Sequence, residues 1–465
     1  MTAALEIEPL PFPEPGWPML NLLGGEPWSM WLDSGQHGTG AGRYDILVGR
    51  PRVTLVTRGG VTEIRRGGNC LRRADDPLAL LQEELNAVEP PAPAELPFTG
   101  GAVGYFAYDL GQRLMGVAGA PAEVPEMAVG IYDHAVVVDH LRAQCWAVGR
   151  RLDRQWLQAL RARTATAPRP GLWEASGPLV CHPDDAAYAT AFRRVQDYLH
   201  AGDCYQVNLA RRFTLPGGGD PQAAYLALRG SGSAPFAAWL RLPGSDVLSL
   251  SPERFLRVDA DGWVTTEPIK GTRPRKTDRL ADERARQELL ASAKDRAENV
   301  MIVDLLRNDL GRVCRFGSVH VPALCEARRF ARVHHLVSTV RGQLAPGYTA
   351  TDLLRGSLPG GSITGAPKRR AMEIIAELEP GSRGVYCGAV GYIGFDGRMD
   401  TSIAIRTAVC QGGAMTYWAG GGIVADSSEA AERRETEDKA IAFLELAGAA
   451  PLREASREAA ISRVR

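Results

Sequence analysis

The sequence has no long apolar segment, no excess of charge of either sign and very little lysine. No apolar run approaches the ~18–20 residues that a membrane-spanning helix requires. The 54 basic and 54 acidic residues cancel, so no whole-chain field would attract nucleic acid or an anionic membrane. The first eight residues lack both the basic and the apolar segment of a secretory signal. We therefore expect a cytoplasmic protein that binds neither nucleic acid nor membrane.

The eight cysteines form no recognisable pattern, because none stands in a Cys-x-x-Cys pair. Their spacing excludes the common zinc motifs and a disulfide scaffold. No cysteine lies in a Gly-x-Cys-x-Gly segment followed by His-x-Glu, the pattern of a glutaminase nucleophile. The chain therefore carries no glutaminase of its own.

Lysine is scarce: of 54 basic residues only Lys270, Lys276, Lys294, Lys368 and Lys439 are lysines, and the rest are arginines. An ammonium can do what a guanidinium cannot, since it acts as a nucleophile or base and fits a narrow pocket. Chance retention is the alternative explanation for any single lysine.

Strands and helices are predicted to alternate in clusters along the 465 residues. Strand-like runs cover 44–48, 53–56, 205–213, 236–242, 247–251, 263–268, 388–395, 401–410 and 417–422. Helical periodicity covers 184–199, 278–310, 367–378 and 428–446. Because short strands gather in antiparallel-sized clusters between long helices, the order favours an α+β fold over a doubly wound βαβ fold.

Two features suggest how the chain is divided. The stretch 100–109 nearly repeats at 387–396, which predicts similar strand hairpins in two halves of one architecture. Proline-rich breaks occur at 90–93 and 166–170. We expect an N-terminal region over 1–165, a catalytic region over 178–448 and a polar tail over 449–465.

Carboxylates occupy unexpected places on two predicted helices. Glu298 shares a helical face with apolar residues that would point to the core, and such a carboxylate is costly unless it is paired or binds a metal. Glu432, Glu435 and Lys439 fall at i, i+3 and i+7, on one face of the last helix. Two inward-facing glutamates on two helices suit Mg²⁺. The alternative is an ordinary surface pair between Glu435 and Lys439.

Three further residues have side chains suited to catalysis. Lys270 lies at a strand end between an isoleucine and a glycine, where partial desolvation would lower its pKa and make it a nucleophile. Glu253, seventeen residues upstream, would lie across a hairpin if the two runs pair. Of the adjacent pair His334 and His335, one is a candidate acid or base and the other structural.

Several stretches are jointly distinctive. They are 205–209 (Tyr-Gln-Val-Asn-Leu), 251–254 (Ser-Pro-Glu-Arg), 298–304 (Glu-Asn-Val-Met-Ile-Val-Asp), 335–338 (His-Leu-Val-Ser), 365–368 (Gly-Ala-Pro-Lys) and 405–406 (Ile-Arg). From residue 28 to residue 439 the chain resembles the chorismate-utilising enzymes: component I of anthranilate synthase and of aminodeoxychorismate synthase, and the isochorismate and salicylate synthases. Anthranilate synthases resemble Pro-Ile-Ala-Gly-Thr where this chain has Pro-Ile-Lys-Gly-Thr at Lys270. This position resembles the aminodeoxychorismate synthase branch, and anthranilate synthase component I or a non-catalytic regulatory partner are the alternatives.

The resemblance implies a fold, a cofactor and roles for residues. It implies two packed antiparallel sheets flanked by helices in α/β/β/α layers. Mg²⁺ is expected on Glu298 and Glu435, with Asp295 and Glu432 in support. The implied chorismate-binding residues are Arg406, Tyr386, Ser362, Gly422 and Lys439. Lys270 is expected to attack C2 of chorismate, with Glu253 as proton donor and His335 near the leaving oxygen.

The resemblance also implies partners. The ammonia that yields 4-amino-4-deoxychorismate, on the para-aminobenzoate branch toward folate, is expected from a separate glutamine amidotransferase in a heterodimer. In relatives the N-terminal part forms a tryptophan pocket. Leu32, Asp33, Ser34, Ala234, Pro235 and Phe236 occupy the corresponding places, with ordinary core packing as the alternative.

Overall fold

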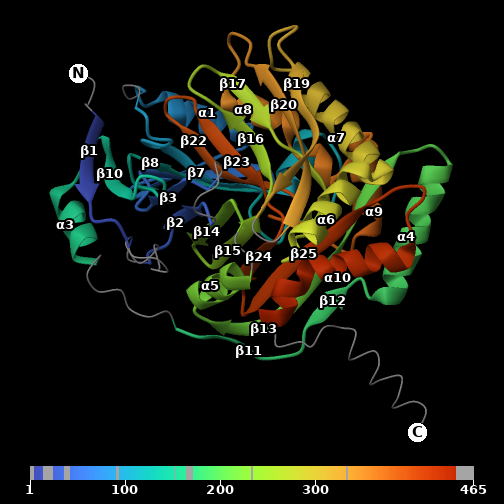
Figure 1. Ribbon diagram of the computed structural model, residues 1–465. Helices are drawn as coiled ribbons and strands as arrows, with labels where there is room; N and C mark the ends of the chain where they lie inside the picture. Colours follow the sequence, from blue (N-terminus) through green and yellow to red (C-terminus); the bar gives the residue numbers. More distant parts are fainter. Residues whose placement is uncertain are drawn as a thin grey trace.

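Strands with one or both faces buried make up most of the fold, and every pairing between them is antiparallel (Figure 1). The computed structural model describes residues 5–13, 23, 25–35, 42–90, 94–150, 152–163, 171–231, 234–330 and 333–446. The predicted break at 166–170, most of the break at 90–93 and the tail at 449–465 lie outside the described residues. Within those residues, 13 strands form a first sheet and 12 strands form a second.

The first sheet runs, in spatial order, through β1 (Leu5–Leu10), β10 (Gln144–Arg150), β9 (His134–Asp139), β3 (Tyr44–Val48), β2 (Met30–Asp33), β14 (Phe236–Leu242), β15 (Ser245–Ser251), β24 (Thr407–Gln411), β25 (Ala414–Ile423), β13 (Gln206–Gly219) and β11 (Trp173–Ala175). Two short strands, β12 (Val180–His182) and β21 (Gly365–Ala366), also pair with β13.

The second sheet runs through β18 (Ile269–Pro274), β20 (Val333–Gln343), β17 (Trp263–Thr266), β16 (Arg254–Val258), β23 (Met399–Ile403), β22 (Ala389–Gly394), β7 (Gly101–Phe106), β8 (Met127–Tyr132), β4 (Val53–Arg58), β5 (Val61–Arg66) and β6 (Asn69–Arg73). Strand β19 (His320–Arg329) pairs with β20.

Helices cover the outer faces of the two sheets. They are α1 (Pro77–Asn86), α2 (Tyr108–Leu114), α3 (Arg154–Arg163), α4 (Asp185–His200), α5 (Pro221–Ser231), α6 (Arg279–Ala291), α7 (Ala293–Gly311), α8 (Ala350–Ser357), α9 (Lys368–Leu378) and α10 (Glu429–Leu446). None of them is long and apolar enough to cross a membrane.

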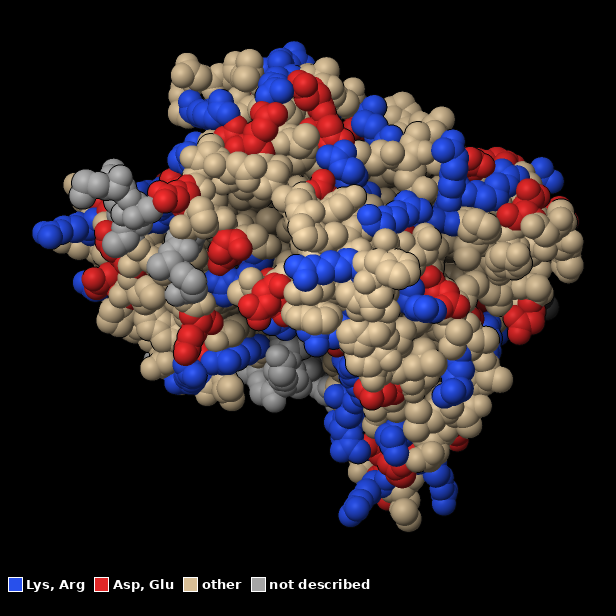
Figure 2. Space-filling model, turned by 90° about the horizontal axis from the view of Figure 1, so that it is seen from above, with Lys and Arg blue, Asp and Glu red and all other residues tan. Residues whose placement is uncertain are grey.

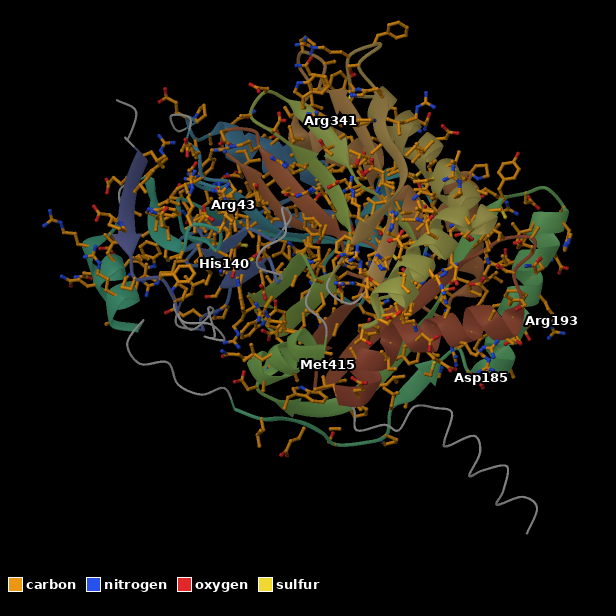
Figure 3. All side chains as sticks on the ribbon, viewed as in Figure 1. Arg43, His140, Asp185, Arg193, Arg341 and Met415 are labelled. Atoms are coloured by element: carbon orange, nitrogen blue, oxygen red, sulfur yellow. The ribbon has the colours of Figure 1, made fainter. Side chains whose placement is uncertain are left out.

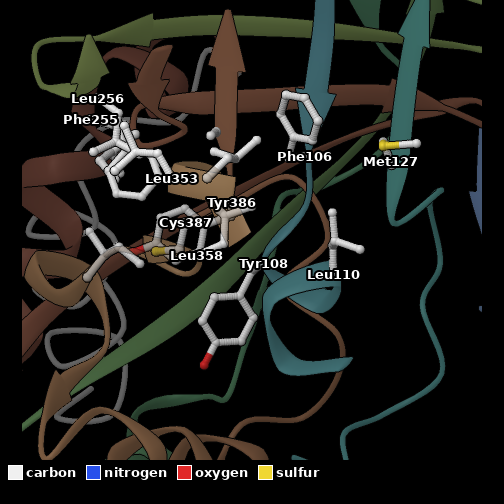
Figure 4. Close-up of a cluster of buried hydrophobic side chains, with 14 of the residues drawn as sticks. Phe106, Tyr108, Leu110, Met127, Phe255, Leu256, Leu353, Leu358, Tyr386 and Cys387 are labelled. Atoms are coloured by element: carbon white, nitrogen blue, oxygen red, sulfur yellow. The ribbon is translucent and has the colours of Figure 1, made fainter. Parts of the chain in front are cut away.

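Three apolar clusters hold the layers together. One lies between the sheets and includes Met30 and Val137 from the first and Tyr105 from the second. Another joins the outer face of the first sheet to α3, α5 and α10. The third joins the second sheet to α1, α7, α8 and α9, and Figure 4 shows part of it around Tyr386 and Cys387. The layer order is therefore helices, sheet, sheet, helices, and the predicted α+β fold with two packed antiparallel sheets is confirmed.

Both sheets combine strands from the N-terminal region with strands from the remainder of the chain. The N-terminal strands meet the later strands at the β2–β14 pair in the first sheet and at the β7–β22 pair in the second. Strands β7 and β22 are the two copies of the near-repeat, and Gly104 lies opposite Gly391. The prediction of two similar hairpins was wrong for the first copy, because β7 continues into α2 rather than into a hairpin turn. The division at 165 and 178 stays a prediction.

Two elements predicted as single are divided, and both divisions shape the site. The strand predicted over 401–410 is two strands in different sheets, β23 and β24, and residues 404–406 cross between them. The helix predicted over 278–310 breaks at Ser292, which ends α6 and caps α7 by accepting a hydrogen bond from the Asp295 N–H at 3.3 Å. Helical periodicity misses such a break, since a serine interrupts the backbone without altering the apolar spacing.

Charge and cysteine follow the sequence-based expectation. Basic and acidic side chains are interspersed on the face shown in Figure 2. All eight cysteines are free thiols. A disulfide scaffold is therefore absent, as predicted.

Candidate active site

One cavity of about 780 Å³ has walls from both sheets and from helices α7 and α10. Every side chain to which the sequence assigned catalysis, chorismate or metal lies on this wall. These residues are Glu253, Lys270, Asp295, Glu298, His335, Ser362, Tyr386, Arg406, Gly422, Glu432, Glu435 and Lys439. The fold thus gathers residues that are up to 186 positions apart in the sequence.

Lys270 and Glu253 are joined through Ser362. Strand β18 carries Lys270 next to a bulge, where Gly271 has φ of 73°. The Lys270 Nζ donates to the Ser362 carbonyl oxygen at 3.1 Å. The Ser362 hydroxyl donates to Glu253 Oε1 at 2.9 Å. The Lys270 amine and the Glu253 carboxyl group are therefore both held in place by hydrogen bonds to Ser362.

Enclosure in the cavity favours the neutral forms of both Glu253 and Lys270. Burial raises the pKa of Glu253 to about 7, although Lys270 and the Ser362 hydroxyl favour its ionised form. Burial lowers the pKa of Lys270, which the Glu298 and Glu253 carboxylates oppose. Such a pair combines a proton donor with an amine that loses its proton more readily than an exposed lysine does.

The two adjacent histidines face opposite sides of strand β20, because successive side chains of a strand alternate. His335 lies on the cavity wall, with Nδ1 3.0 Å from the Thr272 hydroxyl. Burial lowers the pKa of His335 to about 4, so its ring is neutral at pH 7. His334 is fully buried, with Nε2 2.8 Å from Asp282 Oδ1.

The carboxylates come from the starts of two helices. The break at Ser292 places Asp295 and Glu298 in the first turns of α7, and α10 presents Glu432 and Glu435 from the other side. The interval of three residues puts each pair on one helical face. Both helices therefore turn a carboxylate-bearing face toward the cavity.

Burial and mutual repulsion act on this carboxylate group. Burial raises the pKa of Glu298, and Asp295 and Glu432 add to the shift. Burial also raises the pKa of Glu432, with Glu435 contributing. Glu435 differs: burial disfavours its charge, but the Lys439 ammonium 2.5 Å away lowers its pKa. A further cation bound in the cavity would stabilise the ionised forms of Glu298 and Glu432.

The donor set suits a hard divalent cation. Among the described residues, no three His, Cys, Asp or Glu side chains gather closely enough to hold a metal ion by themselves. Mg²⁺ is commonly held by one or two carboxylates, with water and substrate oxygens completing its shell. Glu432 is buried and Glu298 is half-buried, and neither has a close cationic partner in the part of the chain that the structure describes, so these carboxylates fit such a cation.

Arg406 lies where the chain crosses from one sheet to the other. Its φ is 54°, a conformation that non-glycine residues adopt rarely and that clusters at functional sites. Tyr386 lies on the same wall and stacks on Trp418, with ring centroids 6.0 Å apart and planes 9° apart. The prediction of a single strand over 401–410 missed this crossing between the sheets.

Glycines let strand β25 approach the carboxylates and strand β13. A Cβ on Gly421 would lie 2.7 Å from Glu432 Oε2, and a Cβ on Gly422 would lie 2.7 Å from Gln206 Nε2. A Cβ at either position would therefore require the end of the Glu432 or Gln206 side chain to move. The glycine run, which the sequence marked as a place of close approach, thus leaves backbone exposed to the cavity at Gly420 and Gly422.

A second cavity of about 560 Å³ lies beside β2 and β14. Its wall includes Leu32, Asp33, Ser34, Pro235 and Phe236, five of the six residues predicted for a tryptophan pocket. Ala234 is not on the wall and packs in the apolar cluster of the first sheet's outer face.

Some cavity residues had no predicted role. Asn208, Thr272, Arg273 and Lys294 line the catalytic cavity. Asn208 stands in one of the distinctive stretches, and Lys294 is one of the five lysines, so both carried a signal in the sequence. Arg273 donates to Asp295 Oδ2 at 3.2 Å, a contact that no sequence pattern indicates.

Comparison with known proteins identifies the family of the chain. The family of chorismate binding enzymes matches residues 31–445. Aminodeoxychorismate synthase component 1 of Klebsiella aerogenes is 49% identical over 422 residues, which cover 90% of this chain and 93% of that protein. Its counterpart in Escherichia coli K12 is 47% identical over 426 residues, covering 89% and 92%.

The fold has a relative among solved structures. Anthranilate synthase component I from Streptococcus pneumoniae TIGR4 superposes with a TM-score of 0.76 at 32% identity, covering 86% of this chain and 91% of that one. The family match spans nearly the whole chain, including both sheets and the carboxylate-bearing helices. The chain therefore belongs to the family of chorismate binding enzymes, as its motifs indicated.

Proposed function

We propose that this chain is the synthase subunit that converts chorismate and ammonia to 4-amino-4-deoxychorismate. The observation that carries the proposal is Lys270, a lysine with a lowered pKa held beside Glu253 in a cavity that fits a small dicarboxylate. Relatives at 49% and 47% identity bear the name aminodeoxychorismate synthase component 1, whereas the solved anthranilate synthase relative is 32% identical.

Chorismate carries two carboxylates, and the cavity offers a place for each. The Arg406 guanidinium and the Tyr386 hydroxyl would bind the enolpyruvyl carboxylate, because a guanidinium matches a planar acceptor. The ring carboxylate would lie toward α7 and α10, near Lys439 and the backbone at Gly422. The Ser362 turn would close the site over the ring.

Glu298 and Glu435 would hold Mg²⁺, supported by Asp295 and Glu432. When bound, the ion would neutralise these carboxylates and the ring carboxylate of the substrate and withdraw charge from the ring. The chain's own contribution is to present the four carboxylates on two rigid helices, while Lys439 remains paired with Glu435.

In the first half of the reaction, the neutral Lys270 amine would form a bond to C2 of the ring. The two conjugated ring double bonds shift and the C4–O bond breaks, with its electron pair leaving on oxygen. Glu253, protonated in part at pH 7, would give its proton to that oxygen, which departs as water. His335, neutral at this pH, would orient the leaving oxygen by a hydrogen bond.

In the second half, ammonia would form a bond to C4 while both ring double bonds shift back. The C2–N bond then breaks and its electron pair returns to Lys270 as a free amine. The new C4 ammonium gives a proton to the Glu253 carboxylate, which restores the starting state. The sum is chorismate plus ammonia to 4-amino-4-deoxychorismate plus water.

The ammonia would come from a partner glutaminase subunit. The sequence lacks a glutaminase nucleophile pattern, and the relatives' name, component 1, supports a two-component enzyme. The heterodimer with a glutamine amidotransferase is therefore part of the proposal.

The test is incubation of the purified chain with chorismate, Mg²⁺ and ammonium, with products separated by chromatography and identified by mass. Wild-type protein should form 4-amino-4-deoxychorismate, and Lys270→Ala should lose at least about a thousandfold in rate, the scale expected for a covalent nucleophile. Lys276→Ala is the matched control, because Lys276 lies outside the cavity.

Two results would contradict the proposal. Anthranilate from the wild-type chain would place it in the tryptophan branch. Unchanged chorismate in the presence of Mg²⁺ and ammonium would favour a regulatory partner instead.

The second cavity supports a tryptophan site. Its volume of about 560 Å³ is within the ~300–1,000 Å³ typical of small-molecule pockets, so it is larger than a packing defect. Leu32, Pro235 and Phe236 offer apolar contact for an indole ring.

A further inference from the structure

Lys294 contacts carboxylates on both helices of the proposed metal site. Its Nζ lies 4.0 Å from Glu298 Oε1 on α7 and 3.9 Å from Glu432 Oε1 on α10. The side chain lines the catalytic cavity. None of the roles derived above uses it.

Lys294 is attracted to this position but loosely held. Both contacts are at the long limit of an ion pair, and 47% of the side chain is exposed. Lys439 is held differently, at 2.5 Å from Glu435 Oε1, and it also donates to the Gly420 carbonyl at 2.9 Å. An exposed lysine with two long contacts can move away without breaking a strong hydrogen bond.

The ammonium acts as a shared countercharge. Glu432 is buried and Glu298 is half-buried, and the Lys294 ammonium lies within 4.0 Å of a carboxylate oxygen of each. A divalent cation bound to Glu298 would occupy the same region of negative potential. It would repel the Lys294 ammonium at a distance of a few ångströms.

We propose that Lys294 is a built-in competitor of the divalent cation. Its ammonium neutralises Glu298 and Glu432 and withdraws toward solvent when the cation binds. The proposal rests on the magnesium site of the proposed function. Competition by Lys294 makes cation binding to the free enzyme weak. The ring carboxylate of the substrate then strengthens cation binding, so that cation and substrate bind together.

The first test measures Mg²⁺ affinity of the full chain by isothermal titration calorimetry, without substrate. Removing one positive charge near the site in Lys294→Ala or Lys294→Gln should tighten binding about tenfold, an effect of a partly exposed charge at ~4 Å. Lys294→Arg keeps the charge and should bind as the wild type does, and so should Lys276→Ala. Unchanged or weaker binding in both neutral variants overturns the proposal, and so does equal tightening in Lys294→Arg.

The second test measures how accessible the Lys294 amine is to a chemical reagent. The chain has five lysines, so acetylation by a water-soluble reagent can be read at each by mass spectrometry. Mg²⁺ should increase the rate at Lys294 severalfold and leave Lys276 unchanged, because the cation displaces Lys294 from its two carboxylates. A constant rate at Lys294 overturns the proposal.

The incubation with chorismate separates this proposal from the proposed function. If 4-amino-4-deoxychorismate forms while both lysine measurements fail, only the role of Lys294 is wrong. If Mg²⁺ binds neither the wild type nor Lys294→Ala, the competitor role and the metal site fail together.

Discussion

The cavity beside Asp33 and the cavity beside Lys270 are of comparable size, but their charged side chains are balanced differently. In the first, Asp33 receives hydrogen bonds from Arg229 at 2.5 Å and from Tyr225 at 2.8 Å, and Arg254 bonds to Asp400 and Glu267. Arg43, labelled in Figure 3, lies on the same wall and pairs with Asp139. In the second, the loosely held Lys294 ammonium lies near both Glu298 and Glu432, while Glu432 and Glu253 each accept a hydrogen bond from a serine.

The difference shows how one fold separates a pocket whose charged side chains are paired from a reactive one. Charges that are bonded to each other keep a wall rigid and contribute little binding energy to an incoming ligand. Carboxylates with insufficient countercharge are stabilised when a ligand or cation arrives. Three measurements test this difference between the cavities.

The largest effect is expected in the reactive cavity. Glu253→Gln removes the proton donor and should slow formation of 4-amino-4-deoxychorismate about 10²–10⁴-fold. Because the donor must be protonated and its pKa is about 7, the wild-type rate should fall as pH rises above 7. Glutamine does not titrate, so the residual rate of the variant should lose this alkaline decline.

A rate–pH profile with ammonia held constant measures both effects, with Glu373→Gln on the surface of α9 as control. A variant that keeps most of the wild-type rate, or keeps the alkaline decline, would contradict the role of Glu253.

A smaller effect, on stability rather than rate, is expected beside Asp33. Burial and the nearby Asp45 raise the pKa of Asp33, and Arg229 opposes this shift. Arg229→Ala leaves that carboxylate buried without its cation and should lower the free energy of unfolding by about 3 kcal/mol, as for a broken buried pair. Denaturant unfolding measures this loss.

The exposed pair between Arg369 and Glu373 provides the comparison, since Arg369→Ala should cost at most about 0.5 kcal/mol. The turnover of folded Arg229→Ala should equal that of the wild type. Equal stability losses in the two variants would remove the distinction between the buried pair and a surface pair.

The smallest effect concerns the ligand of the second cavity. Tryptophan at about ten times its dissociation constant should raise the free energy of unfolding by about 1.4 kcal/mol, by mass action on the folded state. Tyrosine at the same concentration is the control. If calorimetry detects no tryptophan binding, the cavity is a structural feature of the wall.

The sequence indicated the elements better than their connections. For α4, α9, α10 and most of the nine strand segments that it predicted, periodicity came near the observed bounds, because apolar spacing reflects which face is buried. It missed the crossing at 404–406 and the break at Ser292, since both depend on which sheet or helix receives the next segment. The near-repeat was found, but its two copies pair with each other, which no local pattern shows.

The sequence alone determined the family, through its motifs, and singled out Lys270 through the scarcity of lysine. It also determined which carboxylates share a helical face, since that follows from spacing. Only the tertiary structure decided that two helices turn those faces to one cavity, that Ser362 joins Lys270 to Glu253 and that Lys294 lies between two carboxylates. The physical reason is that burial and distance between remote segments set charge states, and both exist only after the sheets have packed.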